Sequence, residues 1–260
     1  MILASDVATI PGWYGKLPSL GDFASRRLEA DFIEPWDLWL GEALQAQRES
    51  MGDAWLDAYL QSPPWRFVLM PGVLPGFDSE LIVAGVLMPS VDRVGRYFPL
   101  TIAATIASLP TSSAAYEALL AWLHRLEDTA LDALQDDWTI EQLEGALADL
   151  APPPASIEAP ADRLAPVRAA LAESLGGDGG FVEIEEVANR TELASLFTGM
   201  VPVTPVPVAA GESPLSGRAL WFADNLDHPQ LLVSKGLPAN EDFIRMFGSM
   251  GREPGAETIY

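Results

Sequence analysis

The sequence has 260 residues, of which 49% are hydrophobic, and its formal net charge is -22. A chain of this length and hydrophobicity can bury a substantial core, which excludes an intrinsically disordered protein. Such an acidic surface repels nucleic acids and anionic lipid headgroups, so a basic face of another protein is the better candidate for a partner. The chain has no cysteine, which excludes disulfide bonds, thiolate nucleophiles and cysteine-ligated metals.

The acidic charge is concentrated in the second part of the chain. Residues 1–110 carry 13 acidic and 7 basic residues, whereas residues 111–260 carry 24 and 8. We expect a sheet-and-helix domain over residues 1–135 and an acidic portion over residues 136–260, packed on the same sheet as one unit. Two separate domains, joined by the proline-rich connector at residues 152–160, are the alternative.

The first elements are predicted from apolar spacing and from proline and glycine positions. A short aromatic strand is expected over residues 12–17, and a helical region with Pro35 as its first residue follows. Gly52 is expected to interrupt this region, and residues 62–64 (Ser-Pro-Pro) to end it. Three further strands with short connections then predict an antiparallel meander, over residues 65–70, 81–88 and 97–106.

The remaining predicted elements are three helices, an extended loop, two strands and a final helix, in that order. Helices are predicted over residues 113–134, 139–150, 163–175 and 241–246, with strands over residues 218–223 and 230–234 and an extended loop over residues 200–214. This order indicates an α+β fold, an antiparallel sheet with helices packed on it. The N-terminus lacks the basic region of a signal peptide, and no apolar run matches a membrane-spanning helix, so we expect a cytoplasmic protein without membrane insertion.

No residue pattern typical of a catalytic or metal site is found. The segment Gly12 to Lys16 lacks the spacing of a phosphate-binding loop, and no Gly-x-Ser-x-Gly elbow is present. The two histidines, His124 and His228, have no second histidine at metal-ligand spacing. We therefore expect no enzyme activity, no cofactor and no metal.

The connection between the second and third meander strands is unusual, because it places Asp92, Arg93 and Arg96 in a tight link between two apolar segments. In one interpretation Asp92 caps the turn, and the arginines pair with it or with carbonyl groups. In the other, the arginines offer forked donors to a carboxylate or phosphate of a ligand. Tryptophans pose a similar choice: Trp36 fits a core position, whereas Trp65 suits either the core or an interface.

Four segments in order resemble the TagF family: GKLPSLGDF at residues 15–23, PWDLWL at 35–40, WLDAYLQSPPWRF at 55–67 and GVLMPSVDRVGRYFPL at 85–100. The resemblance implies a fold similar to longin and roadblock domains. It also implies a post-translational repressor of bacterial type VI secretion that binds a cytoplasmic forkhead-associated scaffold protein. Some members carry a phosphatase domain, whose Asp-rich metal motifs this chain lacks.

The family has no agreed catalytic residues, so its signature positions are candidates for partner binding or for a structural role. These candidates are Lys16, Asp22, Trp36, Trp65, Ser90, Asp92, Arg93 and Arg96. The alternative function is a small nucleotide-binding or hydrolytic protein that uses Lys16 and the Asp92–Arg96 loop. The sequence leaves the partner-binding face and the oligomeric state open.

Overall fold

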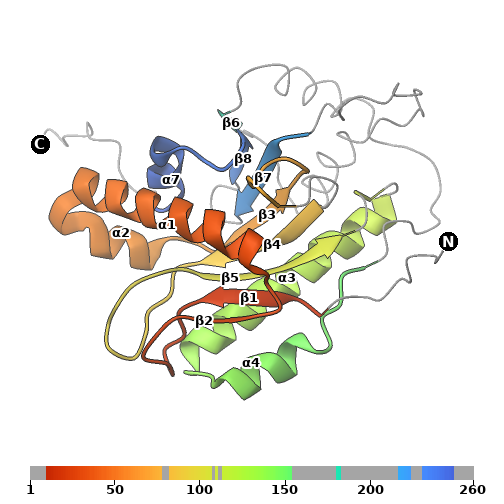
Figure 1. Ribbon diagram of the computed structural model, residues 1–260, viewed down its shortest axis with the longest axis horizontal. Helices are drawn as coiled ribbons and strands as arrows, with labels where there is room; N and C mark the ends of the chain where they lie inside the picture. The colour runs from red at the N-terminus through yellow and green to blue at the C-terminus, as the bar shows by residue number, and fades with distance from the viewer. Residues whose placement is uncertain are drawn as a thin grey trace, which may run out of the picture.

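The computed structural model describes residues 10–77, 82–106, 109–110, 113–153, 180–182, 216–223 and 230–248. Its centre is an eight-stranded sheet in the order β2-β1-β5-β4-β3-β7-β8-β6 (Figure 1). All neighbouring strands pair antiparallel. The strands are β1 (Gly12–Gly15), β2 (Ala24–Arg26), β3 (Trp65–Leu69), β4 (Ile82–Met88), β5 (Leu100–Ile106), β6 (Gly180–Val182), β7 (Arg218–Ala223) and β8 (Gln230–Lys235).

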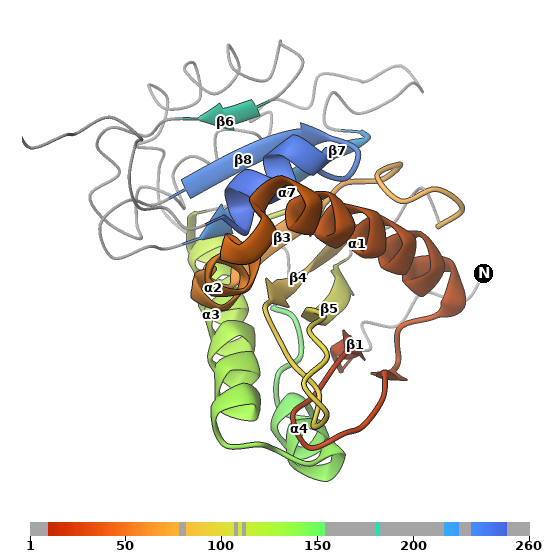
Figure 2. The same cartoon turned by 90° about the vertical axis from the view of Figure 1, so that its left-hand side faces the viewer.

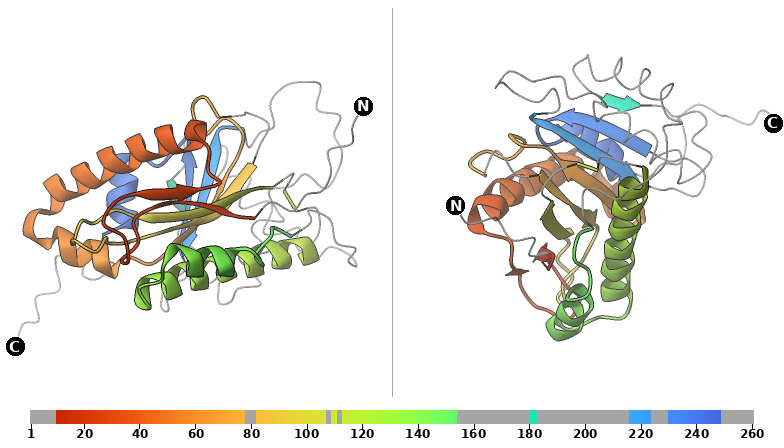
Figure 3. Two further views of the ribbon diagram at one scale, coloured as in Figure 1. Left: turned by 60° about the horizontal axis from the view of Figure 1, so that its bottom comes forward. Right: turned by 90° about the vertical axis from the view of Figure 1, so that its right-hand side faces the viewer.

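Helices cover both faces of this sheet, which gives three layers (Figures 2 and 3). One face carries α1 (Ala30–Met51), α2 (Trp55–Gln61) and α7 (Asn240–Met246), and the other carries α3 (Ser113–Gln135) and α4 (Ile140–Leu147). A single 3₁₀ turn, Gly52–Ala54, separates α1 from α2. The expected α+β fold, an antiparallel sheet with packed helices, is confirmed.

The central strands β3, β4 and β5 form because their residues are largely apolar on both sides of the pleat, with buried Arg66 and Thr101 among the exceptions. Every residue of β3 and β4 is buried, and alternate side chains join the two cores. Gly85 in β4 is needed for the close approach of β5, since a Cβ there would lie 2.2 Å from the Ile102 carbonyl oxygen. Burial on both faces explains why these strands are nearly continuous apolar runs and do not alternate between apolar and polar residues.

The C-terminal helix α7 is held by side chains from the first part of the chain. Trp65 Nε1 and Ser62 Oγ donate to the carbonyl of Met246 at 3.0 and 3.2 Å, and Gln47 Nε2 donates to the carbonyl of Phe247. These carbonyls belong to the helix end, where they have no partner within the helix. Residues of the C-terminal portion thus contribute β7, β8 and α7 to the same layers. The division of the chain at residue 135 stays a prediction.

Several predicted boundaries were wrong. Helix α1 begins at Ala30, not at Pro35, and Pro35 lies inside it. The extra turn forms because Phe32 is buried, with its ring 5.2 Å from that of Trp36. Strand β5 begins at Leu100 and not at residue 97, since Tyr97 forms an isolated bridge with Val91 across the loop.

Strands β2 and β6 were not predicted. The predicted helix over residues 163–175, the extended loop over 200–214 and most of the connector over 152–160 lie outside the described residues. The likeness to longin and roadblock domains stays a prediction from the family resemblance.

Candidate functional site

Two loops that are distant in sequence lie together at the end of the sheet where β1 ends and β5 begins. Residues 16–23 follow β1, and residues 89–96 follow β4; we refer to them as the paired loops. The backbone N–H of Arg93 donates to the carbonyl of Leu20 at 2.8 Å, which joins the two loops directly. Most of the sequence-predicted site residues lie in these loops.

A buried ion pair lies between the loops. Lys16 Nζ is 2.6 Å from Asp92 Oδ2, and the two side chains are 4% and 0% exposed. Such a pair is favourable only when further hydrogen bonds satisfy the charges. Asp92 has them: Oδ1 accepts from the backbone N–H groups of Val94 at 3.0 Å and Arg96 at 2.9 Å, and Oδ2 accepts from Arg96 Nε at 2.7 Å.

The pKa of Asp92 follows from this environment. Burial alone would raise it, but the hydrogen bonds from Lys16, from the backbone and side chain of Arg96 and from the backbone of Val94 together outweigh burial. The pKa of the carboxyl group is therefore held well below its ordinary value. Asp92 is ionised at any physiological pH, and its charge is used to fix the loop.

Ser90 connects the paired loops to α2. Its hydroxyl donates to the carbonyl of Lys16 at 2.8 Å. Its backbone N–H donates to Tyr59 Oη at 2.9 Å, and its carbonyl accepts from the same hydroxyl at 3.0 Å. Ser90 and Tyr59 are both buried, so this junction positions the loop without presenting a surface.

The two arginines of the loop differ in their roles. Arg96 bonds Asp92 through Nε, and its Nη2 donates to the carbonyl of Gly21 and lies 3.9 Å from Asp22 Oδ1. Arg93 is exposed, and its guanidinium makes no hydrogen bond or ion pair to another described residue. The interpretation in which an arginine pairs with Asp92 or with carbonyl groups thus applies to Arg96. The guanidinium N–H groups of Arg93 are available to a ligand or to water.

Phe23 covers the ion pair from outside and was not among the predicted site residues. The ammonium group of Lys16 lies 4.3 Å from the centre of its ring, within the range of a cation–π contact. Phe23 also packs edge-on against Phe98 at 4.8 Å and stacks on Tyr14 at 5.8 Å. Its ring is nevertheless 42% exposed. An aromatic residue that ends a turn-rich segment is the signal that could have indicated it.

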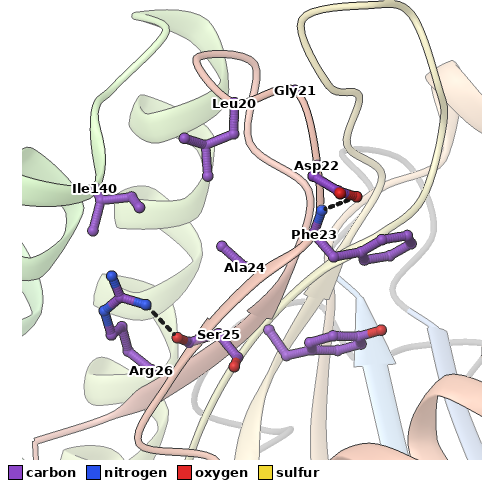
Figure 4. Close-up of a pocket in the computed structure, with 9 residues that line it drawn as sticks. Leu20, Gly21, Asp22, Phe23, Ala24, Ser25, Arg26 and Ile140 are labelled. Atoms are coloured by element: carbon purple, nitrogen blue, oxygen red, sulfur yellow. Dashed lines mark hydrogen bonds between the residues drawn. The ribbon is translucent and has the colours of Figure 1, made fainter.

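A shallow, open hollow of about 610 Å³ lies beside Phe23 (Figure 4). Its wall is formed by residues 20–26, together with Tyr14 and Ile140. Burial, and then the hydrogen bond from its hydroxyl to Asp37, raise the pKa of Tyr14 above its ordinary range, so its phenol stays neutral.

Ile140 begins α4, and the position of this helix is fixed locally and at long range. Thr139 and Gln142 form a capping box at its start, with reciprocal bonds of 2.9 and 3.4 Å. Glu144 of α4 accepts from Trp13 Nε1 at 2.6 Å and is paired with Arg27. The hydrogen bond from Arg27 is the main cause that lowers the pKa of Glu144.

The three remaining predicted site residues are Trp36 and Trp65 in the core and Asp22 at the surface of the paired loops. Trp36 and Trp65 are fully buried, with their indole N–H groups bonded to Thr101 Oγ1 and to the Met246 carbonyl. They lie in the core and offer no surface to a partner. Asp22 is 82% exposed at the side chain, and its Oδ1 accepts from the backbone N–H of Phe23.

The described residues form neither a metal-ion cluster nor a membrane-spanning helix. Within the described ranges, no group of three or more His, Asp or Glu side chains is arranged to hold a metal ion. None of the described helices is both long and apolar enough to cross a membrane.

Comparison with known proteins gives a family. A family model for the TagF N-terminal domain, type VI secretion system-associated, matches residues 12–150. The crystal structure of PA0076 from Pseudomonas aeruginosa PAO1 is similar, with 30% sequence identity and a TM-score of 0.61, over 96% of this chain and 99% of that chain. No curated protein matches. Because the matched region includes β1 to α4 and both paired loops, the chain belongs to the TagF family of proteins associated with type VI secretion.

Proposed function

We propose that this protein is a post-translational negative regulator of type VI secretion that binds the cytoplasmic forkhead-associated scaffold component of the secretion system. The observation that carries the proposal is the match of residues 12–150 to a domain associated with type VI secretion. Under this proposal the protein acts in the cytoplasm by sequestering the scaffold, and it needs no catalytic residues.

The arrangement of the paired loops supports a binding role. Binding surfaces need rigid anchors, because ordering a flexible loop on association reduces affinity. Here the Lys16–Asp92 pair and the Ser90–Tyr59 contacts fix the loops before any partner arrives. Phe23 and Arg93 then remain exposed at their surface, and aromatic and arginine side chains are enriched among residues that dominate binding energy.

The nucleotide-binding or hydrolytic alternative has no observation in its favour. It required the ammonium group of Lys16 to contact phosphate. That group is 4% exposed and is bonded to Asp92 at 2.6 Å, so a phosphate would have to displace a buried carboxylate. Arg96 is likewise bonded to Asp92.

Two measurements test the regulator proposal. The tagged full chain should co-purify with the scaffold protein of its own secretion cluster, and its overproduction should lower effector release from cells. Arg93→Ala, which leaves the buried ion pair intact, is expected to weaken both effects. Arg48→Ala, on α1 where Arg48 packs on the Trp55 ring 4.1 Å away, serves as a control for loss of one exposed arginine. Unchanged effector release on overproduction of the wild-type protein would refute the proposal.

A further inference from the structure

Strand β2 lies at the edge of the sheet. It pairs with β1 on one side, and no described strand pairs with its other side. The carbonyl oxygen of Ser25 accepts from Arg26 Nη1 at 2.7 Å in an exposed position, so this carbonyl points away from β1. In an antiparallel ladder the N–H and C=O of one residue point to the same side. Both backbone groups of Ser25 are thus directed to the open edge.

Edge strands of natural proteins are normally protected against pairing with other chains. Strand β2 carries two such protections: it has only three residues, and the charged Arg26 side chain covers the Ser25 carbonyl. Arg26 is exposed, and a side chain on the surface can rotate away when a stronger acceptor arrives. An incoming strand would then find a free N–H and a free C=O at Ser25.

The hollow beside this edge provides room for a side chain of such a strand. Its wall contains all three β2 residues together with Leu20, Phe23 and Ile140. Figure 4 shows Leu20 and Ile140 on one side of the hollow and Phe23 on the other. Alternate side chains of an added strand reach such pockets, while its main chain makes the hydrogen bonds.

The charged groups around the hollow include one arginine that is available to a partner. Arg26 lies at one end, and at the other the Arg93 guanidinium lies within 3.6 Å of the position of a Cβ on Gly21. Both arginines are exposed, but the carboxylates of Glu141 and Glu144 lie within electrostatic range of Arg26. Asp22 lies on the same rim, 3.9 Å from Arg96 Nη2. Arg93 makes no ion pair with another described residue, so it is the arginine available to a partner carboxylate.

We infer that the open edge of β2 takes up an extended segment of the scaffold partner as an additional strand, with an apolar side chain in the hollow and a carboxylate at Arg93. The identity of the partner rests on the proposed function; the mode of binding rests on the geometry of the edge. Local pairing is compatible with the acidic net charge, because charges more than about 8 Å apart are largely screened at physiological ionic strength.

Ser25→Pro is the decisive substitution. Proline removes the outward N–H and blocks strand addition, and it is tolerated at edge strands where that N–H faces solvent. Ser25→Ala keeps the N–H and serves as the matched control. Circular dichroism and thermal unfolding of both variants establish that the fold is retained. The probe is the purified scaffold protein, titrated against the full chain by calorimetry.

We expect Ser25→Pro to weaken binding about tenfold and Ser25→Ala to leave it unchanged, since one or two main-chain hydrogen bonds are lost. Arg93→Glu, on the rim and outside the strand, should weaken binding roughly threefold as a surface charge contact. This variant tests the charge requirement even if Ser25→Pro unfolds the edge.

The remaining outcomes overturn the inference at different points. If the wild type binds the scaffold and neither Ser25→Pro nor Arg93→Glu weakens binding, the edge is not the interface, and the regulator proposal survives. If the wild type does not bind the scaffold, the proposed partner fails and the inference fails with it. If light scattering shows a dimer that Ser25→Pro converts to a monomer, the occupant of the edge is a second copy of this chain.

Discussion

Replacement of Gln47 by leucine is expected to lower the free energy of unfolding by about 3 kcal/mol, because two buried polar groups lose their partner. Gln47 lies on α1 and is fully buried. Its Nε2 donates to the carbonyl of Phe247 after α7, and its Oε1 accepts from Trp55 Nε1 at 3.0 Å. Leucine has a similar volume and fills the space, but it has no hydrogen-bonding group.

The magnitude follows from the two groups left behind. A buried donor or acceptor without a partner costs about 1–3 kcal/mol, so the Trp55 N–H and the Phe247 carbonyl together lose roughly 2–6 kcal/mol. Burial of an apolar side chain instead of an amide offsets part of this loss, which leaves about 3 kcal/mol. In a protein of this size, that destabilisation lowers Tm by roughly 6–12 °C.

Urea unfolding followed by tryptophan fluorescence measures the change, and Gln45→Leu is the matched control. Gln45 lies on the same helix but is exposed, and it bonds only Glu49 one turn away at 2.8 Å. Its substitution should change stability by less than about 0.5 kcal/mol. If Gln47→Leu is as stable as Gln45→Leu, the network does not hold the C-terminal helix. A second transition for Gln47→Leu would show that α7 unfolds separately from the rest.

Three shorter predictions concern the paired loops and α4. Arg96→Ala should lower Tm in a thermal melt, whereas Arg93→Ala should not, because of the two arginines only Arg96 bonds Asp92. Equal melting temperatures of the two variants would contradict the structural role of Arg96. The pKa of Glu144 is lowered from its ordinary value of 4.5, so its ionised carboxylate stabilises the fold at pH values above 4.5. This contribution is lost as the pH falls below 4.5 toward the lowered pKa. The destabilisation by Glu144→Gln in urea should therefore be larger at pH 7 than at pH 4, and an equal value at both would refute this. Nucleotides should not raise Tm, because the Lys16 ammonium group is already paired with Asp92. A nucleotide that did bind, at 100 times its Kd, would add about 2.7 kcal/mol to the free energy of unfolding, and a clear rise in Tm would restore the nucleotide-binding alternative.

The elements that the sequence predicted well are those with a strong local pattern. Residues 65–70 and 81–88 are largely apolar, with prolines at positions 64, 71 and 89, and β3 and β4 occupy them within a residue at each end. The helix over residues 113–134 has an apolar face at helical spacing, and α3 matches it closely. In these segments local preference and tertiary burial favour the same structure.

The local sequence pattern gave wrong predictions where contacts with residues distant in sequence determine the structure. Strand β2, Ala24–Arg26, has neither alternation nor β-branched residues, and it exists only because β1 pairs with it. The proline at position 35 suggested a helix start, yet burial of Phe32, whose ring packs against that of Phe77 at 5.9 Å, extends α1 toward the N-terminus. Contacts between elements outweigh propensity in both cases.

In the candidate site, too, the local sequence left open what a contact distant in sequence determines. Asp92, Arg93 and Arg96 lie within five residues, and the sequence allowed two interpretations, each of which treated both arginines alike. Lys16 decides between them, 76 positions away in sequence: its ammonium group meets Asp92 in the interior, and Arg96 adds to that pair from its exposed side. Arg93 has no such partner among the described residues and remains at the surface beside Gly21. A buried ion pair contributes little net stability but fixes a specific geometry, and here the geometry it fixes is that of the exposed side chains. A family signature that includes Lys16 and Asp92 is thus compatible with a binding function even though neither residue can contact the partner.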